Sequence, residues 1–202
     1  MTIRHSLDIL QMQGLIERSR GRAGGTFVRS IPPVVELNRI DGFLPQMRKM
    51  GMEVVSEVLK LDVVSANRII ANQLELNEGD SVFQVVRLRS VNATPILIED
   101  SFFPTFLFPD LHQFDLTGSL YELLSERYGV RIYRKNEIIS PTLPSSVEQQ
   151  SLQLSSGVPV LRIRRTSESA DGTKVEYSED VLRCDRANVS VMTRYEGLAS
   201  RQ

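Results

Sequence analysis

Two arginines one residue apart are the side chains of this sequence with the clearest chemical potential. Arg87 and Arg89 lie in the run Val-Val-Arg-Leu-Arg at 85–89, whose composition favours a β-strand. Because side chains two positions apart on a strand point to the same face, we expect the two guanidinium groups about 7 Å apart on one side of a sheet. An anion between them relieves their repulsion, since guanidinium groups bind carboxylates and phosphates through paired hydrogen bonds. The spacing predicts an anion site, with a solvated sheet edge as the alternative.

A glutamate on the neighbouring predicted strand can balance this positive charge. Glu99 lies within 95–102, the next segment expected to be extended. Its carboxylate is placed to pair with one of the arginines when the site is empty. Pairing with arginine and binding to a ligand both remain open for this residue.

A predicted helix start supplies a second set of anion-binding groups. Gly118 precedes Ser-Leu-Tyr-Glu at 119–122, a capping-box pattern in which Ser119 accepts from a backbone amide and Glu122 reaches back. We expect the helix to continue to Gly129. Its free amide groups and the positive end of its dipole favour an anion. Simple capping of the helix is the alternative explanation for the serine.

The elements that must position these side chains repeat along the chain. Positions from Leu74 to Arg87 are similar to positions from Leu152 to Arg165, with a constant offset of 78 residues. Each copy reads as a helix end, a turn and a strand, and each is followed by a second strand. Two similar β-hairpins in one antiparallel sheet are therefore predicted, with chance likeness as the alternative. The remaining elements are expected to be helices over 43–51 and 65–74 and strands over 54–61, 95–102 and 174–182, which gives a mixed α/β fold with helices flanking the sheet.

The first thirty residues differ in charge from the rest of the chain. They hold five arginines against two acidic residues, an excess that suits a polyanion, although a solvated surface explains it equally well. We expect a helix at residues 2–10 that can enter a major groove, then two short strands around a glycine-rich tip. Arginines at such a tip can reach phosphates or the minor groove. The candidate DNA contacts on this helix and tip are Thr2, Arg4, His5, Arg20 and Arg22.

Composition excludes several classes of protein. Hydrophobic residues make up 41% of the chain and charged residues 24%, as in ordinary globular proteins. No apolar run approaches the roughly 18 residues that span a bilayer, and no secretion signal is visible, so we expect a cytoplasmic protein without a membrane partner. Cys184 is the only cysteine, and His5 and His112 lack metal-ligand spacing. No disulfide, metal or cofactor is predicted.

The N-terminal segment resembles part of a known DNA-binding domain. Thr-Ile-Arg-His-Ser-Leu-Asp-Ile-Leu at 2–10, Gly-Leu-Ile-Glu-Arg at 14–18 and Gly-Gly-Thr-Phe-Val at 24–28 are similar to the recognition helix and wing of GntR-type regulators. In that family two helices precede this point, so the resemblance implies that Met1 is an internal methionine. Because a short helix needs tertiary support, we expect this chain to bind operator DNA weakly or not at all.

The rest of the chain resembles the UTRA effector domain of the HutC branch of the same family. The similarity lies in Val-Val-Arg-Leu-Arg (85–89), Thr-Pro-Ile-Leu-Ile-Glu-Asp-Ser-Phe-Phe-Pro (94–104), Ser-Leu-Tyr-Glu-Leu-Leu (119–124), Tyr-Gly-Val (128–130) and Gly-Thr-Lys-Val-Glu-Tyr (172–177). It implies a homodimeric transcription regulator, more often a repressor, that binds operator DNA and a small acidic metabolite. With Pro32 and Pro33 marking a linker, the predicted domains are a partial winged helix-turn-helix at 1–30, a linker at 31–38 and a UTRA domain at 39–198.

The resemblance also implies which residues meet the effector. Arg87, Arg89, Ser119 and Tyr121 are expected to hold its acidic group, and Glu99 and Glu176 to meet hydroxyl or amino groups. Many relatives carry aromatic residues where this chain has Leu182 and Ala187. The effector classes left open are a phosphorylated sugar, an organic acid and an amino-acid derivative. Two positions remain open for Arg162, Arg164 and Arg165, which either face the pocket or lie on the outer surface.

Two other functions remain as alternatives. The effector domain is similar in fold to chorismate lyase, which also binds an acidic compound among arginines and a glutamate. The sequence offers no activated nucleophile or histidine–carboxylate pair, so we predict that the protein is not an enzyme. The second alternative is a stand-alone module for ligand binding or dimerisation.

Overall fold

The computed structural model describes residues 3–12, 16–19, 21, 24–28 and 32–193, and it divides into two compact units, 1–33 and 34–202. Three of the candidate DNA contacts, Thr2, Arg20 and Arg22, lie outside the described residues. Within the described part of the chain, none of the helices combines the length and the apolar character needed to cross a membrane.

The smaller unit contains one helix and one two-stranded ribbon. Helix α1 spans Ile3–Met12, and strands β1 (Ile16–Ser19) and β2 (Gly25–Val28) pair antiparallel. An ion pair of 2.5 Å between Arg18 Nη1 and Asp8 Oδ1 joins the helix to the ribbon. On α1, the side chains of Arg4 and His5 are exposed to solvent.

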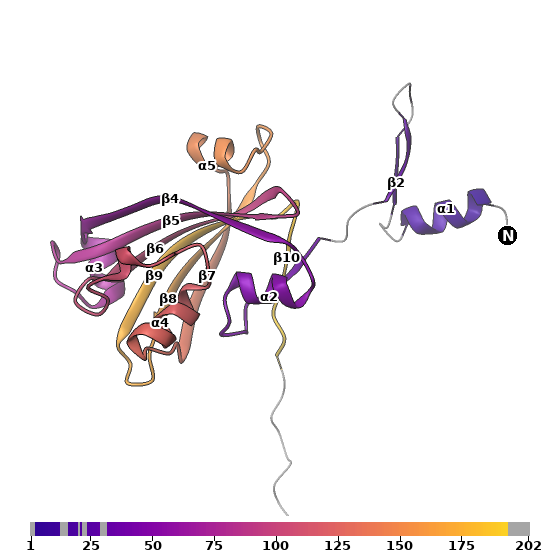
Figure 1. Cartoon of the computed structure of the whole chain (residues 1–202). Coiled ribbons are helices and arrows are strands. Elements are labelled where there is room, and N and C mark those ends of the chain that lie inside the picture. Colours follow the sequence, from indigo (N-terminus) through magenta and orange to yellow (C-terminus); the bar gives the residue numbers. More distant parts are fainter. Residues whose placement is uncertain (1–2, 13–15, 20, 22–23, 29–31, 194–202) are drawn as a thin grey trace, which may run out of the picture. The chain divides into compact units, whose positions relative to one another are not determined.

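The larger unit is built on one six-stranded sheet (Figure 1). All neighbouring strands run antiparallel, in the order β4-β5-β6-β9-β8-β7. This confirms the predicted antiparallel sheet flanked by helices. The strands are β4 (Val54–Ser65), β5 (Ser81–Val91), β6 (Thr94–Pro104), β7 (Arg134–Thr142), β8 (Val160–Glu168) and β9 (Lys174–Arg183).

The two predicted hairpins form the centre of this sheet. Strands β5 and β6 make one hairpin, β8 and β9 make the other, and β6 pairs with β9 between them. The first turn contains Asn92 and Ala93 with φ of 48° and 61°. Two consecutive positive φ values give a tight turn whose twist matches that of the strands. The two hairpins are the two copies of the repeat. Arg87 on β5 and Arg165 on β8 therefore lie at equivalent positions.

Helices cover both faces of the sheet. On one face, α2 (Phe43–Lys49) packs in an apolar cluster with Leu97, Ile163 and Leu182, and α4 (Leu120–Tyr128) packs in a second cluster around Phe83, Val85 and Phe103. The polar and charged residues of β5, β6, β8 and β9 lie between these two clusters. The opposite face carries α3 (Arg68–Leu74) with its apolar cluster, and a further cluster that includes Leu152 and Leu154, which follow α5 (Ser146–Ser151). A short 3-10 helix, η1 (Leu111–Gln113), precedes α4.

The structure differs from the sequence expectation at several elements. Val34–Glu36, which we assigned to the linker, form strand β3 and pair in parallel with β10 (Asn188–Ser190). Strand β4 runs to Ser65, so α3 begins later than expected, where the side chain of Asn67 caps it. Strand β7 had no counterpart in the sequence analysis, whereas helix α5 ends at the point where the repeat predicted a helix end.

Candidate functional site

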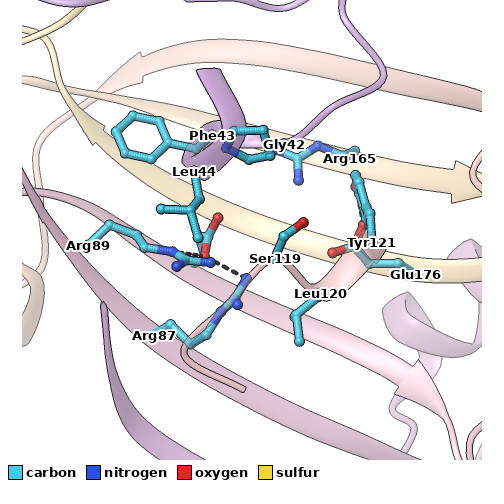
Figure 2. Close-up of a pocket in the computed structure, with 12 residues that line it drawn as sticks. Gly42, Phe43, Leu44, Arg87, Arg89, Ser119, Leu120, Tyr121, Arg165 and Glu176 are labelled. Atoms are coloured by element: carbon cyan, nitrogen blue, oxygen red, sulfur yellow. Dashed lines mark hydrogen bonds and ion pairs between the residues drawn. The ribbon is translucent and has the colours of Figure 1, made fainter. Parts of the chain in front are cut away.

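The six candidate effector residues line one pocket on the α2 and α4 face of the sheet (Figure 2). The pocket encloses about 360 Å³, including the space at its open mouth. Its walls come from β5, β6, β8 and β9, from the start of α4 and from the segment that opens α2. Its lining residues are Gly42, Phe43, Leu44, Pro45, Arg87, Arg89, Glu99, Ser119, Leu120, Tyr121, Arg165 and Glu176.

The paired arginines are buried and share one carboxylate. Arg87 is 4% exposed and Arg89 is 2% exposed, so neither lies on a solvated sheet edge. Glu99 Oε2 lies 2.7 Å from Arg87 Nη2 and 2.9 Å from Arg89 Nε. Both strands place these side chains on the same face, because Arg87 and Glu99 are direct neighbours in the β5–β6 register.

The same arginines hold the chain that leads into α4. Arg87 Nη1 donates to the carbonyl oxygens of Leu116 and Gly118, both at 3.0 Å. Arg89 donates to Thr117 O at 2.9 Å and to Gly118 O at 3.1 Å, and it also contacts the hydroxyl of Ser56. These carbonyl groups satisfy guanidinium donors that burial removes from water. The first strand hairpin therefore fixes where α4 begins.

Charge pairing keeps the glutamate of this group ionised. Burial works against the charged form of Glu99, but the nearby guanidinium groups of Arg87 and Arg89 lower its pKa to about 2. One carboxylate between two cations leaves a net positive charge at this end of the pocket. That charge attracts an anion from solvent.

The start of α4 lies against the arginine pair, as Figure 2 shows for Ser119. The Ser119 hydroxyl accepts from the backbone amide of Glu122 at 3.3 Å. The predicted capping box is only half formed, because no return bond from the Glu122 side chain is present among the described residues. A complete capping box occurs instead at Ser145 and Glu148 of α5. Gly129, with φ of 68°, ends α4 as expected.

A tyrosine and a glutamate face each other at the other end of the pocket. Tyr121 donates from its hydroxyl to Glu176 Oε2 at 2.6 Å, and Ser167 donates to the same oxygen at 2.8 Å. Burial raises the pKa of Tyr121 well above 10, and the charge of Glu176 adds to this rise. The tyrosine therefore stays protonated and acts as a donor. Contact of Glu176 with ligand groups stays a prediction: its side chain lines the pocket, and two protein hydroxyls donate to one of its oxygens.

Comparison with known proteins gives the family of this larger unit. Residues 49–188 match the UTRA domain. The chain belongs to the UTRA domain family. This confirms the resemblance found in the sequence, and it places Arg87, Arg89, Glu99, Ser119, Tyr121 and Glu176 all inside the UTRA match.

Relatives of the whole chain are transcription regulators. The HTH-type transcriptional repressor NagR of Bacillus subtilis is 29% identical over 186 residues, which cover 92% of this chain and 76% of NagR. The repressor MngR of Escherichia coli, named for a mannosyl-D-glycerate transport and metabolism system, is 27% identical over 185 residues, with the same coverage. These relatives favour the predicted regulator over the enzyme alternative.

A solved structure shares the fold. The crystal structure of PhnF from Mycobacterium smegmatis superimposes with a TM-score of 0.83 at 23% identity, over 96% of this chain and 84% of that one. The match extends over both units of the chain, each of which therefore has a counterpart in a solved protein.

One arginine that the sequence analysis left undecided belongs to the pocket of this UTRA domain. Arg165 donates from Nε to Glu137 Oε1 at 2.7 Å and pairs through Nη2 with Asp180 Oδ2 at 2.5 Å. Arg162 and Arg164 do not line the pocket. The internal repeat could have predicted that Arg165 lines the pocket, because Arg165 is equivalent to Arg87 at the offset of 78 residues.

Proposed function

We propose that this protein is a DNA-binding transcription regulator whose UTRA domain takes a small acidic effector into the pocket at Arg87 and Arg89. The observation that carries the proposal is the burial of two guanidinium groups with a single carboxylate between them, next to the start of α4. Buried charges are costly unless they are paired, so a net positive pocket favours an anionic ligand.

The proposed contacts follow the predicted ones. Arg87, Arg89, Ser119 and Tyr121 hold the acidic group, and Glu99 and Glu176 receive donors from the rest of the effector. An anion near Ser119 also meets the positive end of the α4 dipole.

We further propose that residues 1–30 contact operator DNA and that residues 31–33 connect them to the effector-binding unit, which begins with strand β3. The exposure of Arg4 and His5 on α1 supports this assignment, as does the description of NagR as an HTH-type repressor. The proposed DNA contacts are Thr2, Arg4, His5, Arg20 and Arg22. A homodimer in the cytoplasm, binding a two-fold operator, fits the way such regulators read DNA. No catalytic role is assigned, because the relatives are regulators.

The test is ligand-induced thermal stabilisation. Inorganic phosphate and a panel of acidic metabolites should raise the Tm of the wild-type chain, since ligands that bind only the folded state stabilise it. Arg87→Lys keeps the positive charge but cannot make the bidentate hydrogen bonds of a guanidinium group. We expect the affinity of this variant for the same ligands to fall about tenfold or more.

Arg164→Lys is the matched control, because Arg164 is an exposed arginine on the equivalent hairpin outside the pocket. It should respond to ligands as the wild type does. An equal response from Arg87→Lys would remove Arg87 from the site. Failure of every acidic compound to stabilise the wild type would remove the proposed effector pocket.

A further inference from the structure

A second pocket adjoins the first, and carboxylates outnumber cations among its lining residues. It encloses about 410 Å³, including open space, and shares Gly42, Phe43, Glu99 and Arg165 with the first pocket. The first pocket is lined by three arginines and two carboxylates, whereas the second is lined by five carboxylates, one lysine and one arginine. The five carboxylates are Glu36, Asp41, Glu99, Glu137 and Asp180. The two pockets share part of one wall, and we call the arginine-lined pocket the positive end and the carboxylate-lined pocket the negative end of this region.

The negative end contains a buried carboxylate oxygen without a partner. Asp180 is 1% exposed and lines the second pocket. Its Oδ2 pairs with Arg165, but its Oδ1 accepts no hydrogen bond from any described residue. A buried acceptor left unsatisfied costs free energy, so the site favours a donor that reaches this oxygen.

Glu137 lies beside Asp180 around the same arginine. Its Oε1 accepts from Arg165 Nε, and Lys135 Nζ is 3.6 Å from that oxygen. One guanidinium group thus serves two carboxylates, the reverse of the first pocket, where one carboxylate serves two guanidinium groups. Arg165 and Lys135 balance the charges of Glu137 and Asp180, so the feature at this end that favours a ligand is the unsatisfied Oδ1 of Asp180.

Apolar side chains flank the charged residues of the second pocket, and the distance between the two ends is short. Leu97, Ile163 and Leu182 line the second pocket next to the charged residues. Arg87, Glu99 and Asp180 are direct neighbours on three successive strands, so the two ends are about 10 Å apart at the backbone. A spacer of a few carbon atoms can join groups at the two ends.

We propose that the effector is a bipolar molecule, with an anionic head at Arg87 and Arg89 and a protonated amine at Asp180 and Glu137. This inference rests on the proposed effector function and names the chemical class of the ligand. A purely anionic molecule leaves Asp180 Oδ1 unsatisfied, whereas an ammonium group donates a charge-assisted hydrogen bond to it.

Matched pairs of simple phosphates test the proposal by titration calorimetry at pH 8, where Asp180, whose pKa burial raises to about 7, is mostly ionised. Ethyl phosphate and propyl phosphate carry only the anionic head, while 2-aminoethyl phosphate and 3-aminopropyl phosphate add the amine. At least one amine compound should bind the wild type about tenfold more tightly than its alkyl partner, the effect of one charge-assisted hydrogen bond. Asp180→Asn should abolish this preference without weakening the binding of the alkyl phosphates.

Two further variants keep the test decisive. Glu137→Gln should reduce the amine preference and decides the outcome if Asp180→Asn does not fold. Asp62→Asn, at an exposed carboxylate of β4 outside both pockets, should change nothing. Equal binding of the amine and alkyl compounds to the wild type overturns the amine site while the anion pocket stands. Binding of neither class overturns the anion pocket and, with it, this inference.

Discussion

At the scale of single residues, the pocket is a chain of charges that satisfy one another across four strands. Glu99 sits between Arg87 and Arg89, and Asp180, its neighbour in the β6–β9 register, pairs with Arg165. The two central carboxylates differ because their surroundings differ. Two guanidinium groups hold Glu99 ionised, whereas Asp180 has one.

This difference appears in the pKa of Asp180. Burial raises it from 3.8 to about 7, Arg165 opposes the rise, and the charges of Glu99 and Glu176 add to it. Because the carboxyl group of Asp180 binds its proton more tightly in the folded state than in the unfolded state, Asp180 stabilises the fold most below pH 4. That contribution is lost as the pH rises from about 4 to about 7, by about 1.4 kcal/mol for each unit of pKa shift.

The pH prediction is tested by urea unfolding between pH 4 and pH 8. Asp180→Asn removes the titrating group, so we expect its free energy of unfolding to fall less than that of the wild type over this interval. Asp62→Asn, which alters an exposed carboxylate, should follow the wild type. Parallel curves for the wild type and Asp180→Asn would contradict a raised pKa for this residue.

At the scale of elements, local patterns predicted the parts of the site that depend on local structure. The spacing of Arg87 and Arg89 on one strand, the turn at Asn92 and the helix start at Ser119 all follow from residues close in sequence. The strand pairing could also be anticipated, because the repeat makes two equivalent hairpins.

The missed elements depend on contacts between distant segments. Strand β3 forms because Val34–Glu36 meet Asn188–Ser190, more than 150 residues later, and no local pattern predicts that pairing. Strand β7 is an edge strand with several exposed positions, so it lacks a continuous apolar alternation. Because this strand was not predicted, Glu137 and Lys135, which it carries, were not recognised as residues of the negative end.

Two serine caps distinguish helix stability from ligand binding. Ser119 caps α4 beside the arginines, and Ser145 caps α5 on the opposite face of the sheet. Replacing either serine by alanine should cost about 1 kcal/mol of unfolding free energy, since each loses an acceptor for a backbone amide. Only Ser119→Ala should also weaken the binding of inorganic phosphate, measured by calorimetry. If Ser145→Ala weakens it equally, the loss reflects general stability and Ser119 has no contact with the anion.

At the scale of the whole molecule, the proposed function requires that the two units influence each other. The chain divides after Pro33 into a unit with the proposed DNA contacts and a unit with the effector pocket. An effector that changes the affinity for DNA must, by thermodynamic linkage, have its own affinity changed by DNA by the same factor. The proposal therefore makes a reciprocal and quantitative prediction.

Because we expect this chain to bind DNA weakly, the measurement is a pair of titrations at low salt, where binding to DNA is strongest, with the chain, a duplex selected by this protein from random sequence and the tightest-binding acidic compound. Effector should shift the affinity for the duplex, and duplex the affinity for effector, by one common factor in the range of about 5 to 150. Arg87→Lys should reduce the effector's influence at a fixed concentration while leaving the affinity for DNA alone unchanged. Arg4→Ala, on the exposed face of α1, should weaken DNA binding and lower its salt dependence while effector binding to the free protein stays the same. If the duplex leaves effector affinity unaltered at saturation, the UTRA domain binds its ligand without regulating the DNA-binding unit, and the regulatory mechanism fails even though the pocket remains.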